Sequence, residues 1–265
     1  MKLENALIAI LASTASASPI FWKRDSINST NSSSNTRLSP VTGEQTTYLN
    51  TWSNITFPEV KNCNVTQVKY INKYYQDMLE VLSVARSHLI EYNNDSVFKH
   101  WFGNGNPLTV LGVLDNIASG SKDGVLYRCD DIEGECASHL TTYPGYHRSD
   151  ENATGETVLC DLFFTSKKPL EDMCVIGSLI EVGPKKFAGV DLFHRFLHIE
   201  SINKGFVGEY TEELKMLLNI VRVIVLMLLL NTDSLLYYIT EAYSVELTGD
   251  GCLGDYPSNT TTHTS

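Results

Sequence analysis

The sequence predicts a helix-rich α+β domain with a small sheet, held together by disulfides. Apolar residues that recur every three or four positions predict most of the helices, and two short segments rich in β-branched and aromatic residues predict strands. Six cysteines predict three disulfides. Because 43% of the 265 residues are hydrophobic, the chain can bury a sizeable core, which we expect over residues 51–255.

The first part of this domain is expected to be helical. A long amphipathic helix is expected over residues 64–92, with Asn64 and Gln67 placed to form a capping box. A short helix is expected over residues 96–102, before a glycine, and another over residues 107–118, with a proline in its first turn.

The middle of the domain is expected to contain the sheet, and the last part returns to helices. The remaining elements are expected, in order, as a strand, a polar loop, a second strand and three helices, over residues 125–129, 130–155, 157–164, 185–200, 207–230 and 234–246. The longest apolar run, Met216 to Leu230, spans only about 15 residues and contains Asn219 and Arg222, which is short for a membrane span. We therefore expect a buried helix there and no membrane span.

The N-terminus has the pattern of a secretory signal peptide, expected over residues 1–17. A short apolar stretch follows Lys2, and Ala15-Ser16-Ala17 matches the small-residue pattern of a cleavage site. Residues 18–50 are rich in Ser, Thr and Asn and are expected to form a disordered linker, and residues 256–265 a polar tail. Seven N-x-S/T sequons predict a glycoprotein: Asn28, Asn31, Asn54, Asn64, Asn94, Asn152 and Asn259.

An even number of cysteines in a secreted chain predicts that all of them are paired. Six cysteines allow 15 connectivities, which the sequence alone does not distinguish. Proximity along the chain favours the pairs Cys129–Cys136 and Cys160–Cys174, which leaves Cys63–Cys252 to tie the two ends of the domain together.

The composition also excludes some classes of partner. The formal net charge is −11 and the sequence pI is about 5.0. Nucleic acid needs a basic surface to neutralise its phosphates, so it is not an expected partner. The same acidity disfavours binding to an anionic membrane surface.

Two histidines in the segment of residues 188–198 indicate a metal site. His194 and His198 are four residues apart, which on a helix places both imidazoles on one face, close enough to share an ion. Such a pair needs a third ligand, for which Glu209 and Glu212 are the candidates. Asp191 precedes His194 by one turn and is expected to orient its imidazole.

Several segments around this pair resemble, in one order, the fungal HRxxH family of secreted, zinc-regulated surface proteins, which includes zincophore-type pH-regulated antigens, a zinc- and pH-regulated yeast surface protein and mould allergens. The resemblance covers about residues 50–255. The matching segments are KHWFGNG (99–105), RCDDIEGEC (128–136), LCD (159–161), TSKKPL (165–170), GPKK (183–186), AGVDLFHRFLH (188–198), NTDS (231–234) and GCLG (251–254).

The resemblance implies a zincin-like fold related to the deuterolysin-type metalloproteases, with Zn²⁺ as the metal. In those enzymes an acidic third ligand follows the second histidine by about eleven residues, which favours Glu209 over Glu212. The resemblance also implies a location outside the cell, in the cell wall or at the cell surface, and expression under zinc limitation. It further implies zinc scavenging or presentation to a plasma-membrane zinc transporter, and contact with host serum proteins.

Two features depart from the pattern that the resemblance implies. Arg195 stands where a zincin has its catalytic glutamate, and an arginine cannot accept the proton of a metal-bound water. Asp191 and Glu212 are the alternative bases. The stretch from Asn219 to Leu230 is almost purely apolar, whereas family members are polar there; it is either native or a frameshift-like divergence.

Three functions are consistent with these residues. The leading hypothesis is a secreted zinc-binding protein on an inactive metalloprotease scaffold, with His194, His198 and Glu209 as ligands. An active zinc endopeptidase with a different base is the second, and a non-enzymatic cell-wall or host-protein-binding antigen with a structural metal is the third. Beyond these ligands, His100, His139 or His147 could assist the site.

Overall fold

The computed structural model describes residues 52, 55–148, 150–209 and 228–255. The predicted signal peptide, linker and polar tail lie outside these residues. So do Glu212 and most of the helix expected over residues 207–230, including all but the end of its apolar stretch. Within the described part of the chain, no helix is both long enough and apolar enough to cross a bilayer.

The helices predicted in the first part of the domain are confirmed. Helix α1 spans Val65–Tyr92, and its capping box is present: the Asn64 side chain accepts from the Gln67 backbone amide while the Gln67 side chain accepts from that of Asn64. Two further helices follow α1, namely α2 (Ser96–Phe102) and α3 (Pro107–Ser119).

The sheet has four short strands in the order β1-β2-β4-β3. Strands β1, β2 and β4 run parallel, and β3 pairs antiparallel with β4 at one edge. Both predicted strands are present, but β1 and β3 were not predicted, because a proline directly precedes each of them and weakens the sequence signal for a strand. The strands span Glu59–Lys61 (β1), Leu126–Arg128 (β2), Gly145–His147 (β3) and Glu156–Leu159 (β4).

The strand predicted to continue to residue 164 is wrong in its second half, because Asp161–Ser166 forms helix α5. Cys160 has the extended backbone of an N-cap and Asp161 supplies an acid to the first turn, where the helix dipole favours it. Short helical turns complete the middle of the chain: α4 (Glu135–Ser138), η2 (Glu151–Ala153), η3 (Leu170–Asp172), α6 (Leu179–Val182) and η4 (Pro184–Lys186).

The single helix predicted over residues 185–200 is divided into η4, α7 (Ala188–Leu197) and the start of α8 (Glu200–Asn203). Phe187 breaks it: its extended backbone forms a parallel bridge with Lys168, and the Ala188 amide donates to the Lys168 carbonyl. The final helix, α11 (Thr232–Thr248), is slightly longer than predicted. Residues 207–209, where another helix was expected to begin, are not helical.

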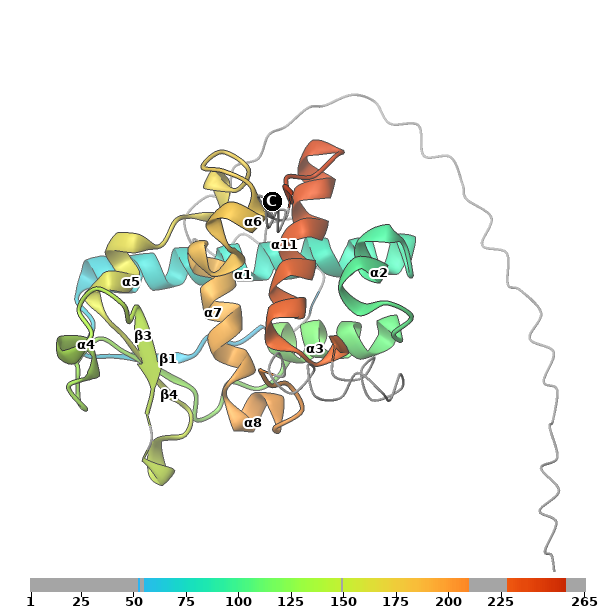
Figure 1. The fold of residues 1–265 in the computed structure, drawn as a ribbon. Helices are drawn as coiled ribbons and strands as arrows, with labels where there is room; N and C mark the ends of the chain where they lie inside the picture. Colours follow the sequence, from blue (N-terminus) through green and yellow to red (C-terminus); the bar gives the residue numbers. More distant parts are fainter. Residues whose placement is uncertain (1–51, 53–54, 149, 210–227, 256–265) are drawn as a thin grey trace, which may run out of the picture. The chain divides into compact units, whose positions relative to one another are not determined.

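Helices α7 and α11 both pack across α1, and their shared contacts form the core (Figure 1). The approach of α7 to α1 is so close that it depends on Gly189. A Cβ at this position would lie 2.7 Å from the Met78 amide nitrogen and 2.8 Å from the Asp77 Cβ. Because these are mainly backbone atoms within a helix, they cannot move aside cheaply.

All three expected disulfide pairs are wrong. The structure pairs Cys63 with Cys129, Cys136 with Cys160, and Cys174 with Cys252. The sheet explains the first pair: β1 and β2 are parallel neighbours with Lys61 opposite Arg128, so the cysteines that follow them meet at one edge. The second joins the end of β4 to α4, and the third ties the segment after α11 to the loop before α6.

We expect Gly189→Ala to lower the free energy of unfolding by about 1–3 kcal/mol, because the added methyl group pushes α7 away from α1. The matched control is Gly112→Ala in α3, where a Cβ meets no atom within 4 Å. This control should be neutral or stabilising by about 0.5–1 kcal/mol, since alanine is the better helix former. Urea unfolding of both variants checks the difference, and equal effects would contradict it.

Candidate metal centre

The two histidines lie at the C-terminal end of α7. His194 is in the last turn and His198 is the C-cap residue. Their Nε2 atoms are 2.9 Å apart, and the ring planes are nearly perpendicular. The side chains are partly accessible, at 18% for His194 and 32% for His198. The i, i+4 spacing therefore brings both imidazoles together at one accessible place, as the sequence predicted.

Glu209 reaches the pair from the loop that follows α8. Its Oε1 atom lies 3.6 Å from the Nε2 atoms of both His194 and His198. The ligand atoms of the three residues all lie within 4.8 Å of one another. Of the two candidate third ligands, Glu209 is thus beside the pair, while Glu212 lies outside the described residues.

Two features hold the Glu209 loop in place. The Asn203 side chain donates to the carbonyls of Leu197 and Val207 and accepts from the Val207 amide, which closes the loop back onto the end of α7. Next to Glu209, Gly208 forms a parallel bridge with Asn231 at the start of α11.

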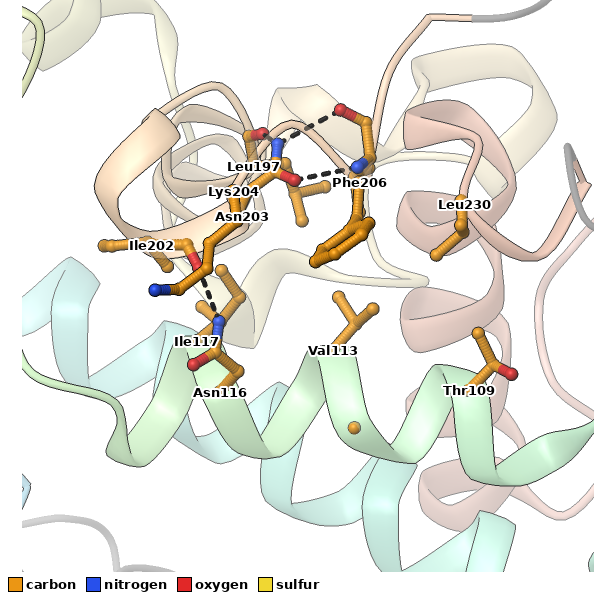
Figure 2. A pocket seen from close by; sticks show the side chains of 12 residues that line it. Thr109, Val113, Asn116, Ile117, Leu197, Ile202, Asn203, Lys204, Phe206 and Leu230 are labelled. Carbon is orange, nitrogen blue, oxygen red and sulfur yellow. Dashed lines mark hydrogen bonds between the residues drawn. The ribbon is translucent and has the colours of Figure 1, made fainter.

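A cavity of about 390 Å³ lies on the side of this loop that faces α3 (Figure 2). Its lining is mainly apolar and includes Val113, Ile117, Phe206 and Leu230. The Asn116 side chain donates to the Ile202 carbonyl across one end of it. The cavity is separate from the three candidate ligand side chains, none of which lines it.

The donor set fits a tetrahedral zinc ion. With Zn–N and Zn–O bonds of about 2.0–2.1 Å, neighbouring ligand atoms in a tetrahedron lie about 3.3 Å apart. The separations of 2.9 Å and 3.6 Å in the structure deviate from this value by a few tenths of an ångström. Two imidazoles and one carboxylate are also ligand types that zinc commonly takes.

The surroundings keep both imidazoles in the neutral form that a metal requires. Burial lowers the pKa of His194 to about 3; the Asp191 carboxylate opposes this effect, while His198, Lys185 and Arg195 add to it. Burial also lowers the pKa of His198, with the Glu209 carboxylate acting in the opposite direction. Proton competition for these nitrogens is therefore weak near neutral pH.

Asp191 makes contacts different from the one expected. Its side chain is buried, with one carboxylate oxygen accepting from Lys167 Nζ and the other from Arg195 Nε, both at 2.9 Å. Burial alone would raise the pKa of Asp191, but the two cations hold it below its ordinary value. Both oxygens are thus engaged by cations, which leaves Asp191 poorly placed to serve as a base or to orient His194.

Arg195 is buried beneath the sheet, with an exposed fraction of 5%. Its guanidinium lies close to the edge strand: a Cβ at Gly145 in β3 would be 2.8 Å from Arg195 Nη1. The guanidinium carbon also lies 5.9 Å from the centre of the Phe163 ring. The side chain at the position of the zincin glutamate is therefore held in an ion pair under β3.

Of the three additional histidines, the structure brings only His147 to the pair. His147 is in β3, and its ring centre is 5.6 Å from that of His198. By contrast, His100 stacks on Trp101, and His139 stacks on Tyr143. These three histidines could not be told apart from the sequence, because the antiparallel pairing that carries His147 to the site involves an unpredicted strand.

The structure combines a small mixed sheet with a helix that carries an H-R-x-x-H pair and an acidic side chain from the loop that follows. This spacing is that of a metallopeptidase motif, with arginine in place of the glutamate. The chain belongs to the HRXXH family, described as "Putative peptidase family", whose pattern matches residues 4–255. The resemblance inferred from the sequence is thereby confirmed.

Curated relatives are fungal proteins. Protein ZPS1 of Saccharomyces cerevisiae is 38% identical over 255 residues, which cover 95% of this chain and 97% of the relative. Antigen 1 of Emericella nidulans is 32% identical over 207 residues, covering 77% of this chain and 74% of the relative. The pH-regulated antigen PRA1 of Candida albicans is 29% identical over 204 residues, covering 75% and 67%.

Replacing Arg195 with methionine should lower the free energy of unfolding by about 3 kcal/mol, because it removes one of the two cations that neutralise the buried Asp191 carboxylate. Asp191→Asn should lower the free energy of unfolding much less in this variant than in the parent protein. The reason is that the arginine variant has already lost the interaction that the two residues share. Lys99→Met, on the exposed face of α2, is the control and should change stability by about 0.5 kcal/mol or less. Additive effects in urea unfolding would count against the ion pair.

Proposed function

We propose that this protein binds zinc outside the cell through His194, His198 and Glu209, and that it captures the ion rather than using it for hydrolysis. One observation carries the proposal: three donor atoms lie within 4.8 Å of one another on a scaffold that lacks a base in the zincin position. The proposal includes delivery of the ion to an uptake transporter in the plasma membrane. Host serum proteins are a second class of partner in it.

The state of Arg195 supports capture over hydrolysis. In a zincin, the glutamate after the first histidine takes a proton from metal-bound water. A guanidinium stays protonated at all ordinary pH values, and this one donates to a buried carboxylate. Asp191, the other nearby acid, is held by Lys167 and Arg195. Neither side chain is placed to activate a water molecule on the ion.

The disulfides and the relatives support a location outside the cell. Three disulfides in a domain of this size are typical of oxidising compartments, and the described residues contain no free cysteine. Two of the relatives are named as antigens. The proposed place of action is therefore the cell surface, the cell wall or the surrounding medium.

The secreted, disulfide-bonded protein should bind one zinc ion, and His194→Ala/His198→Ala should abolish binding, because it removes two of the three proposed donors. Glu209→Gln should weaken binding by roughly 10- to 100-fold, since an amide is a poorer ligand than a carboxylate. Competition with a chromophoric chelator measures both. Equal zinc affinity in the parent and the double histidine variant would rule out the site.

A peptidase assay separates capture from hydrolysis. The zinc-loaded protein should not cleave a peptide library above the level of the double histidine variant. Turnover that a chelator abolishes and zinc restores would instead favour an endopeptidase with a different base.

A structural metal is tested by the melting temperature of the protein in chelator. We expect this temperature to fall by only a few degrees, because three disulfides and a large core remain.

Zinc affinity should depend little on histidine protonation between pH 7 and pH 5.5. An ordinary imidazole has a pKa near 6.5, so two of them would cost roughly 100-fold in affinity over this range. Here burial lowers the pKa of His194 to about 3 and also lowers that of His198, so protons compete for both nitrogens less than they do for ordinary imidazoles. Chelator competition at several pH values checks this, and a loss near 100-fold would contradict it.

A further inference from the structure

We propose that His147 is a fourth ligand of the zinc site, so that three imidazoles and the Glu209 carboxylate close the coordination sphere. This inference rests on the proposed zinc-binding function and deepens it. A closed sphere with four protein ligands is typical of ions that are held, whereas catalytic zinc keeps one position open for water.

The first observation is an unpartnered nitrogen. His147 Nε2 is buried, and it has no hydrogen-bond partner within the described part of the chain. Leaving a buried polar atom without a partner costs about 1–3 kcal/mol, so each such atom calls for an explanation. A metal ion is a partner that the lone pair of a neutral imidazole commonly takes.

The second observation is that the other nitrogen has a partner that can fix the tautomer. His147 Nδ1 lies 3.0 Å from Thr157 Oγ1, and the two residues are register partners on β3 and β4. When Nδ1–H donates to this hydroxyl, Nε2 carries the free lone pair. A hydrogen bond to the remote nitrogen is how proteins orient metal-binding histidines.

The third observation is the distance between the rings. Two imidazoles that share an ion through Nε2 place their ring centres roughly 5 Å apart, given Zn–N bonds of about 2.0–2.1 Å. The ring centres of His147 and His198 are 5.6 Å apart, and those of His194 and His198 are 4.7 Å apart. The spacing of His147 is therefore compatible with a common ion.

One movement is required. His147 is outside the group of three residues whose ligand atoms lie within 4.8 Å of one another, so ion binding must draw its ring inwards. The position of the strand that carries it allows such a shift. Strand β3 has three residues and lies at the edge of the sheet, where it pairs with β4 alone.

The test compares His147→Phe with His139→Phe in the full-length, disulfide-bonded protein. Both variants replace a histidine that packs against another ring, but His139 stacks on Tyr143 away from the site. Zinc affinity is measured by chelator competition. The visible absorption of bound Co²⁺ gives a second readout, because its intensity falls when water replaces a protein ligand. Circular dichroism and melting without metal check that each variant is folded.

We expect His147→Phe to lose at least tenfold in zinc affinity and to weaken the Co²⁺ absorption, while His139→Phe stays within about twofold of the parent. If His147→Phe matched His139→Phe in both readouts while the His194→Ala/His198→Ala variant failed to bind, the three-ligand site would stand and the fourth ligand would be excluded. If the parent itself bound no zinc, the proposed function would fail, and this inference with it.

A milder variant covers the case in which His147→Phe does not fold. Thr157→Val keeps the volume of the buried threonine but removes the hydroxyl that holds His147 Nδ1. We expect it to reduce zinc affinity by roughly 3- to 10-fold and to leave the other two histidines untouched. An affinity equal to that of the parent would overturn the role assigned to His147.

Discussion

Burial of the Asp191 carboxylate is the constraint on which the site depends. A charge in the core needs countercharges, and here Lys167 comes from the segment after α5 while Arg195 comes from the next turn of α7. The resulting cluster fixes α7 to the segment before it and, through the Arg195 guanidinium under Gly145, to the edge strand. On the opposite side, Gly189 lets the same helix touch the backbone of α1.

The two faces of α7 therefore have different roles, one structural and one at the candidate metal site. Asp191 and Arg195 share one face, where they complete the core, and His194 and His198 share another, where they remain accessible. Both pairs follow from the same four-residue spacing. The residue type at position 195 thus belongs to the packing of the helix rather than to the chemistry at its end, and zinc capture is compatible with that arrangement.

The sequence predicted those parts of the structure that depend on local patterns. The capping box of α1, the ends of α2, and the meeting of His194 with His198 all follow from residues within one or two turns of each other. Glu209 was placed by analogy with the spacing in related enzymes, and the structure brings it to the pair.

Contacts between distant segments were not predictable in the same way. The Cys63–Cys129 disulfide follows the parallel pairing of β1 with β2, and proximity along the chain carries no information about that pairing. The contact of Lys167 with Asp191 and that of His147 with His198 also arise only once the chain has folded. Strand β3 follows Pro144 directly, and a proline beside so short a run weakens the sequence signal for a strand.

The buried ion pair also bears on how such a scaffold can evolve. Returning the motif to H-E-x-x-H by exchanging Arg195 for glutamate would place two carboxylates one turn apart in the core, with Lys167 as their only described countercharge. Such a pair would have to keep one carboxyl group protonated or lose stability. The residues at positions 191 and 195 are therefore coupled, and glutamate at position 195 requires a second change that removes or neutralises the buried aspartate.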